Sequence, residues 1–163
     1  MPIPGVEQPE FLQVTEQIRL RKFDDQFEFA HAWYQDTEAM YMMDGEPEAY
    51  PPERVERMYR YLDQHGELYF IEMLEGNTYV PIGDVTFWQE DMPIIIGDAH
   101  YRGQQIGKSV VAALIKRGKS LGYETLYVAE IYDHNIISRK CFEALGFRAC
   151  EKTEKGHRYK LTL

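Results

Sequence analysis

One stretch constrains the fold more than any other: a short apolar run that passes, without a linker, into a long amphipathic segment. The run spans residues 93–99, and Gly103 and Gly107 lie in the turn that follows it. From Gln104 onward the apolar residues recur at helical spacing, at Ile106, Val110, Val111, Leu114 and Ile115. A strand that turns through glycines into a helix is typical of α/β proteins.

The same turn predicts an anion site. The first turn of a helix exposes backbone N–H groups without internal partners, and the helix dipole adds partial positive charge there. Glycines let the backbone approach a bulky anion, while Arg102 and Lys108 add formal charge. The alternative is a glycine turn that simply opens an amphipathic helix.

The turn is not a nucleotide-binding P-loop. That motif requires G-x-x-x-x-G-K-S/T, and Gly107, Lys108 and Ser109 supply only its end. The first glycine would have to be residue 102, which is Arg, and Gly103 lies one residue too close. An anion bound at this turn would therefore occupy a site other than a P-loop.

Periodicity along the rest of the chain predicts one α/β domain with a mixed sheet over residues 1–163. Residues 1–17 are polar, contain Pro2, Pro4 and Pro9, and are expected to form a loose lead-in. The "MMDGEPEAYPPE" stretch should break regular structure. The strands expected are 18–23, 68–74, 80–89, 92–99, 124–132, 147–154 and 157–163. The helices expected are 27–34 after a cap at Asp24-Asp25, 53–65, 104–119 and 135–145.

Composition excludes several classes of protein. No apolar stretch approaches the roughly 20 residues that span a bilayer, and the N-terminus lacks the features of a secretory signal. The two cysteines, Cys141 and Cys150, are expected as reduced thiols in the cytoplasm, with a disulfide as the alternative. A net charge of −9 argues against a general nucleic-acid binder.

The charge is unevenly distributed along the chain. Residues 24–91 hold seventeen Asp and Glu against three Arg, a net of −14, whereas residues 92–163 carry a net of +5. One interpretation is an uneven solvated surface. The other is that the first half receives a cationic ligand and the second half an anionic one.

Two motifs resemble those of the GCN5-related N-acetyltransferases, the GNAT superfamily. The segment "YRGQQIGKSVVAALI" resembles the family's coenzyme A signature R/Q-x-x-G-x-G/A, with Arg102, Ile106 and Gly107 in register. Gln105 stands where the family usually has its central glycine. The segment "NIISRKCFEALGF" resembles the N-x-x-A/S-x-R/K-x-Y-x-x-x-G-F motif at Asn135, Ser138, Lys140, Gly146 and Phe147.

The resemblance implies an acetyl-CoA-dependent fold and site. The fold would be a mixed, mostly antiparallel twisted sheet with a splayed parallel pair, its fourth and fifth strands, flanked by about four helices. The backbone of Ile95, Ile96, Gly97 and Asp98 would pair with pantetheine. The turn residues would hold the pyrophosphate: Arg102, Gly103, Gln104, Gln105, Ile106, Gly107 and Lys108. Asn135, Ser138 and Lys140 would complete the coenzyme site, although Asn135 is equally suited to cap a helix.

The catalytic residues are less clearly specified by the resemblance. Relatives often use a carboxylate base near these strands, which favours Glu90 or Asp91, although both also suit a solvated turn. Phe142 stands where many relatives have a tyrosine general acid, so a proton for the leaving thiolate would come from water or Tyr132. The scattered histidines lack metal-ligand spacing, so no metal is expected.

The sequence therefore predicts an N-acetyltransferase for a small cationic amine, such as an aminoglycoside or polyamine. A protein or peptide N-terminus is the rival acceptor. A non-catalytic acyl-CoA-binding regulatory module is the alternative of another class. A homodimer is also considered, because dimers are common in the family.

Overall fold

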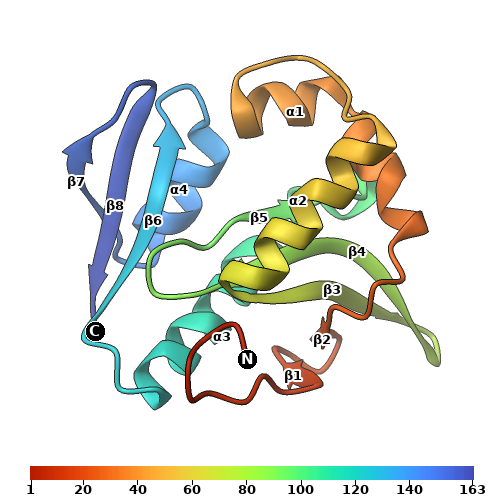
Figure 1. Cartoon of the computed structure of the whole chain (residues 1–163), viewed down its shortest axis with the longest axis horizontal. Coiled ribbons are helices and arrows are strands. Elements are labelled where there is room, and N and C mark those ends of the chain that lie inside the picture. The colour runs from red at the N-terminus through yellow and green to blue at the C-terminus, as the bar shows by residue number, and fades with distance from the viewer.

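A computed structural model describes all residues from 1 to 163 (Figure 1). Its strands form two antiparallel sheets, one of five strands in the order β1-β2-β3-β4-β5 and one of three in the order β6-β8-β7. The strands are β1 (Phe11–Gln13), β2 (Ile18–Lys22), β3 (Glu67–Glu75), β4 (Thr78–Phe87), β5 (Ile94–Ile96), β6 (Thr125–Tyr132), β7 (Arg148–Lys152) and β8 (Gly156–Thr162). The α-helices are α1 (Thr37–Asp44), α2 (Pro52–His65), α3 (Ile106–Ser120) and α4 (Ile136–Ala144). The 3-10 helices are η1 (Glu28–Gln35) and η2 (Ala99–Tyr101).

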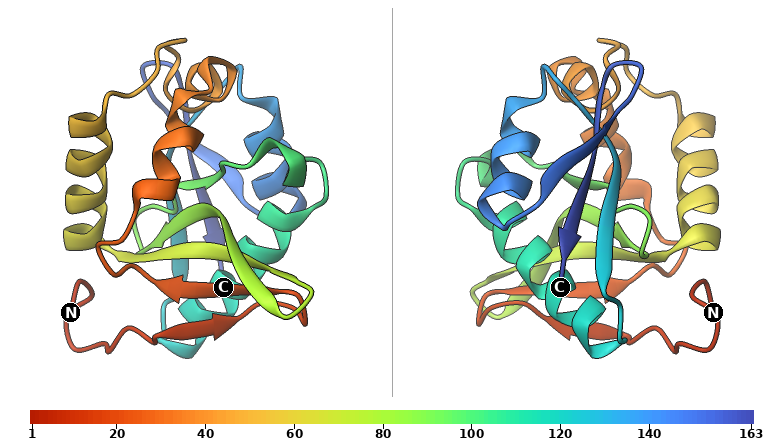
Figure 2. Two further views of the ribbon diagram at one scale, coloured as in Figure 1. Left: turned by 90° about the vertical axis from the view of Figure 1, so that its right-hand side faces the viewer. Right: turned by 90° about the vertical axis from the view of Figure 1, so that its left-hand side faces the viewer.

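The larger sheet is covered by helices on both faces (Figure 2). In β3 successive side chains point to opposite faces. Tyr69 and Ile71 belong to a buried cluster with α3 and the smaller sheet, and Leu68 and Phe70 to a second cluster with η1, α1 and α2. All four side chains are inaccessible to solvent. The predicted α/β class and mostly antiparallel sheet are therefore confirmed.

The two long helices form where the sequence predicts them. Pro52 occupies the first turn of α2, where its missing N–H costs nothing, and α2 buries Val55, Tyr59 and Leu62. In α3 the apolar stripe buries Val110, Val111 and Leu114 against the sheet. Each helix is stabilised mainly by burial of this stripe.

The N-terminal segment is more ordered than the expected loose lead-in. Residues Phe11–Gln13 form β1 and pair with β2, with Leu12 opposite Leu20. The Gln8 side chain is buried and donates a hydrogen bond to the carbonyl of Leu68 at 2.9 Å. A strand of three residues is too short to show a periodic sequence pattern, so β1 can be identified only from its pairing with β2.

The region after β2 also differs from the prediction. Asp25 has a φ of +66° and caps nothing; the segment Glu28–Gln35 is a 3-10 helix without a side-chain cap. The α-helix begins later, because Asp36 accepts hydrogen bonds from the backbone of Glu38 and Ala39. Helix α1 thus occupies part of the stretch expected to be irregular.

The predicted parallel pair is not present as a ladder: β5 and β6 are edge strands of different sheets. Just before β5, however, the backbone N–H of Tyr127 donates to the carbonyl of Gln89, and that of Ala129 to the carboxylate of Asp91, each at 2.9 Å. These contacts advance in the same direction along both segments. Beyond them no ladder joins the strands, so the two sheets are linked at this junction and separate after it.

Candidate functional site

The turn between β5 and α3 leaves a row of backbone donors free. None of the N–H groups of residues 103–108 donates to an acceptor within the chain, and the first that does is Ser109, to Gln105. A Cβ atom placed on Gly103 or Gly107 would meet nothing within 4 Å, so the surroundings are open. Because these donors lie at the start of a 15-residue helix, they are available to an anion.

Gln105 adopts a backbone conformation that favours glycine. It precedes α3 with a φ of +65°, and Gly103 has a φ of +76°. Residues with a side chain visit this left-handed region rarely, and at a cost. This explains why a glycine at position 105 would suit the turn and shows that glutamine is accommodated there under strain.

Arg102 is held by three acceptors. Its Nε donates to the carbonyl of Ile96 at 2.8 Å and its Nη2 to that of Gly97 at 3.1 Å. Its Nη1 donates to the carboxylate of Asp36 at 2.8 Å. Arg102, the residue predicted to bind phosphate, therefore lies beside the end of β5, but its guanidinium is already paired with Asp36.

The predicted pantetheine-binding strand is short and tightly covered. Ile95 lies opposite Asp84 in β4. Gly97 packs so closely against Trp33 that a Cβ atom would lie 2.1 Å from the indole. The carboxylate of Asp98 accepts from the backbone N–H of His100 and thereby caps η2. These contacts fix the path of the backbone toward the turn.

The second motif lies at the start of α4. The side-chain oxygen of Asn135 accepts from the backbone N–H of Ser138 at 3.2 Å, so Asn135 caps the helix. Its amide nitrogen makes no hydrogen bond within the chain. Burial raises the pKa of the Cys141 thiol, and the positive charge of Lys108 lowers it by less. Lys108 therefore lies near α4, while Lys140 is exposed.

The two predicted bases lie at the junction of the sheets. Glu90 is exposed and forms an ion pair with Arg158 at 2.8 Å. Asp91 is half-buried, and its Oδ1 accepts from the backbone of Met92 and of Ala129. Burial raises the pKa of Asp91, and these hydrogen bonds lower it by less. Both carboxylates therefore help to hold the junction.

A third carboxylate lies in the larger sheet. Asp84 in β4 is 3% exposed, and its Oδ2 accepts from the hydroxyls of Tyr34 at 2.6 Å and Tyr59 at 2.8 Å. Burial raises the pKa of Asp84 to about 6, and the tyrosine hydrogen bonds oppose the shift. The sequence marks Asp84 only by its position within a strand; no local pattern identifies the tyrosines.

Two aromatic residues bear on the search for a general acid. Phe142 is buried and packs edge-on against Phe147, with ring centroids 5.2 Å apart. It belongs to the core and has no proton to give. At the end of β6, burial and then the charge of Glu130 raise the pKa of Tyr132, so that its hydroxyl stays protonated at neutral pH.

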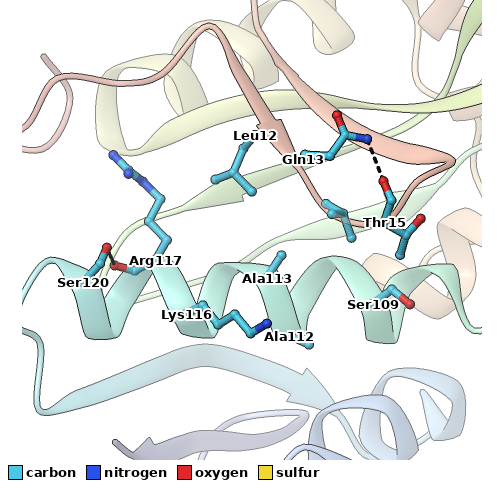
Figure 3. Close-up of a pocket in the computed structure, with 10 residues that line it drawn as sticks. Leu12, Gln13, Thr15, Ser109, Ala112, Ala113, Lys116, Arg117 and Ser120 are labelled. Carbon is cyan, nitrogen blue, oxygen red and sulfur yellow. Dashed lines mark hydrogen bonds between the residues drawn. The ribbon is translucent and has the colours of Figure 1, made fainter.

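One groove lies away from these residues. It has a volume of about 560 Å³ and runs between α3 and the β1–β2 turn, as Figure 3 shows, where Ala113 and Arg117 lie on the side of α3 that faces Leu12 and Thr15. A second groove of about 360 Å³, between η1 and α2, is lined by acids. Its acidic residues are Asp25, Glu28, Glu53 and Glu56. None of the helices is long and apolar enough to span a bilayer.

Comparison with known proteins decides the family. Residues 17–148 match the acetyltransferase (GNAT) domain. The chain belongs to the GNAT acetyltransferase family. The resemblance seen in the two sequence motifs is thereby confirmed. An uncharacterized protein of Methanocaldococcus jannaschii, MJ1062, is 36% identical over 93 residues, which are 54% of this chain. The chain matches only 18% of the length of that relative.

Solved structures agree on the fold. A domain from Methanocaldococcus jannaschii has a TM-score of 0.77 and 26% identity over 90% of this chain and 99% of its own. An aminoglycoside acetyltransferase in complex with coenzyme A has a TM-score of 0.72 and 16% identity over 89% and 94%. A Salmonella typhimurium acetyltransferase that modifies the N-terminal serine of ribosomal protein L7/L12 has a TM-score of 0.72 and 17% identity over 94% and 99%. At such identities the last two show the GNAT fold alone.

Proposed function

We propose that this GNAT chain transfers an acetyl group from acetyl-CoA to the primary amine of a small cationic acceptor. The observation that carries the proposal is the row of free backbone N–H groups at residues 103–108, which follows β5, a strand that forms no ladder with β6. These donors suit the diphosphate of a coenzyme. Lys108 adds positive charge there, and Arg102 would add more on leaving Asp36.

The remaining coenzyme contacts are proposed on the same basis. The backbone of Ile95, Ile96, Gly97 and Asp98 would bind the pantetheine arm. Because the oxygen of Asn135 is engaged by Ser138, its free amide N–H₂ is the group that would reach this arm. Lys140, exposed on α4, would lie near the phosphates.

Bound acetyl-CoA would supply an acetyl thioester. The chain's own residues would orient the amine and manage two protons. As the amide N–C bond forms and the C–S bond breaks, the amine proton passes to Asp91 or Glu90. Tyr132 or water then gives a proton to the departing thiolate. Burial raises the pKa of Asp91 and so makes its carboxylate a stronger base than a free one, whereas Glu90 is exposed and paired with Arg158.

The pH–rate profiles of Glu90→Gln and Asp91→Asn test this assignment. Asparagine at position 91 keeps an oxygen to accept from Ala129, so the junction should persist while the base is lost. We expect at least a tenfold fall in kcat and loss of the acidic limb for whichever residue is the base. Unchanged profiles in both variants would remove both candidates.

The cationic acceptor is supported by charge. Six exposed acids near η1, α1 and α2 form no ion pair: Glu28, Glu38, Glu46, Glu48, Glu53 and Asp63. A fold neighbour acts on aminoglycosides, which are polycationic amines. Another modifies a protein N-terminus, which supports a protein or peptide N-terminus as the alternative acceptor.

Released thiol, measured over an acceptor panel with acetyl-CoA, tests the function. The panel contains polyamines, aminoglycosides, a peptide with an N-terminal serine and an acidic amine. We expect the highest kcat/KM with polyamines or aminoglycosides. Preference for the peptide would support the rival acceptor, and coenzyme binding without turnover would support a regulatory module.

We also propose one domain in a reducing compartment such as the cytoplasm. Cys141 and Cys150 are both free thiols, as such a compartment requires. Size-exclusion chromatography with light scattering would establish whether the chain forms a homodimer.

A further inference from the structure

The ion pair between Arg102 and Asp36 joins the coenzyme turn to the acceptor side of the molecule. The two residues are 66 positions apart, and the Nη1 to Oδ2 distance is 2.8 Å. Arg102 is also the residue immediately before the free N–H groups of residues 103–108. Its guanidinium makes no contact with that row; its three partners are Asp36 and the carbonyls of Ile96 and Gly97.

Asp36 uses its two carboxylate oxygens for different tasks. Oδ1 accepts from the backbone of Glu38 at 3.1 Å and of Ala39 at 3.2 Å, and so begins α1. Oδ2 accepts from Arg102. The pKa of Asp36 is lowered first by the hydrogen bond from Arg102 and then by that from Ala39. One carboxylate therefore ties the capped start of α1 to Arg102, and loss of Arg102 would free this helix end from the turn after β5.

The far end of α1 contacts the second coenzyme motif. The ring of Tyr41 stacks on His134 with centroids 4.6 Å apart, and Nε2 of His134 lies 2.9 Å from the carbonyl of Tyr41. Gly45, at the end of α1, lies against the ring of Tyr132. His134 immediately precedes Asn135. Helix α1 therefore reaches from the turn after β5 to the segment after β6, and Figure 1 shows it between α2 and α4.

We propose that Asp36 competes with the coenzyme diphosphate for Arg102, so that coenzyme binding releases the start of α1 on the acceptor side. The inference rests on the proposed function. A diphosphate offers more negative charge and more acceptor oxygens than one carboxylate, and a guanidinium binds phosphate in a bidentate manner. Asp36 is then a positioning residue: it acts on the coenzyme through Arg102.

The direction in which coenzyme affinity changes when the ion pair is removed distinguishes this role from a structural one. In the free protein, coenzyme binding must break the Asp36–Arg102 pair, so the pair weakens binding. Both side chains are about one-third exposed, 35% for Arg102 and 33% for Asp36, and a pair of this kind contributes little. Its removal should therefore tighten binding only roughly two- to fivefold. A residue that merely supported the turn would weaken binding when changed.

Titration calorimetry with coenzyme A on the full chain tests the competition. Asp36→Asn keeps a good helix cap and removes the charge. We expect this variant to bind coenzyme A roughly two- to fivefold more tightly than the natural chain. Asp44→Asn is the matched control: it removes one negative charge from the other end of α1, where Asp44 pairs with Arg54. Its affinity should be unchanged, and in an Arg102→Gln background the gain from Asp36→Asn should vanish.

Hydrogen exchange provides a second measurement that does not depend on turnover. Coenzyme A should speed exchange in residues 37–40 and slow it in residues 103–108. Asp36→Asn keeps the cap but lacks the ionic tie to Arg102, so exchange of residues 37–40 should already be faster than in the natural chain without coenzyme. Equal affinities for Asp36→Asn and the natural chain, or slower exchange in α1 on binding, would overturn the coupling alone. Absence of coenzyme A binding in every variant would overturn the proposed function as well.

Discussion

Gln105 is the one residue with a side chain that has a positive φ in the turn between β5 and α3. A φ of +65° costs a residue with a Cβ about 1 kcal/mol, and glycine avoids this cost but gains freedom in the unfolded chain. We expect Gln105→Gly to raise the free energy of unfolding by up to about 1 kcal/mol, measured by urea denaturation.

Gln104 is the matched control for that substitution. Its Nε2 donates to the carbonyl of His100 at 2.9 Å, and its φ is not positive. Gln104→Gly should therefore destabilise the chain by about 1 kcal/mol, since it loses a hydrogen bond and makes the unfolded state more flexible. Equal effects of the two substitutions would show that the left-handed conformation of residue 105 is not strained.

Asp84 makes stability depend on pH. Its folded pKa of about 6 is above the ordinary value of 3.8, so the folded state holds this proton more tightly than the unfolded state. The resulting stability is fully present below pH 3.8 and is lost as pH rises through about 6. At about 1.4 kcal/mol for each pKa unit, the loss is roughly 3 kcal/mol.

Asp84→Asn should remove this dependence, because asparagine cannot ionise but still accepts hydrogen bonds from Tyr34 or Tyr59. We expect the stability of the variant, relative to the natural chain, to rise by roughly 3 kcal/mol between pH 4 and pH 8. Urea denaturation at several pH values would measure it. A stability difference that stays constant over this range would mean that the ionisation of Asp84 is not coupled to folding.

Between elements, one buried ion pair joins α3 to β3. Glu67 is inaccessible to solvent and accepts from Arg117 at 2.6 and 2.7 Å. Removal of one partner leaves a buried charge without compensation. We expect Arg117→Ala to lower the free energy of unfolding by about 3–5 kcal/mol, measured by denaturation.

The double variant Glu67→Gln with Arg117→Met is the control for this pair. Since neither charge remains, it should be less destabilised than Arg117→Ala alone. If the double variant were at least as unstable as the single one, packing of the arginine stem, and not the buried charge of Glu67, would explain the loss.

Elements with a long apolar stripe were predictable, and those fixed by distant partners were not. The stripes of α2 and α3 and the alternation in β3 predict their positions well. Strand β1 has three residues and exists because β2 lies beside it. Helix α1 begins where Asp36 caps it, whereas Asp24-Asp25 gave an equally good local signal farther upstream.

The features of the candidate site likewise differ in how well the sequence predicts them. The free donors of residues 103–108 follow from local rules, because glycines and a helix start suffice to predict them. The partners of Arg102, Asp84 and Glu90 come from elements remote in sequence, so no local pattern contains them. The separation of β5 from β6 likewise depends on where Gln89 and Asp91 join the two sheets.

At the scale of the whole molecule, the acidic and basic halves of the sequence predict how acceptor binding responds to salt. The half with a net charge of −14 supplies η1, α1 and α2, where six exposed acids lack an ionic partner. Attraction between exposed charges is screened over about 10 Å at 0.1 M salt. We therefore expect the KM for a polyamine to rise severalfold between 0.05 and 0.5 M salt, while the KM for a monoamine changes little.

Paired substitutions separate this local attraction from the overall charge. Glu46→Gln with Glu48→Gln removes two exposed acids just after α1. Glu16→Gln with Glu124→Gln removes two exposed acids elsewhere and changes the net charge equally. The first pair should raise the KM for a polyamine roughly two- to fivefold with kcat unchanged, and the second pair should not. Steady-state kinetics at low salt would measure both. An equal rise in both pairs would assign the attraction to net charge, and no rise in either would remove the acidic half from acceptor recognition.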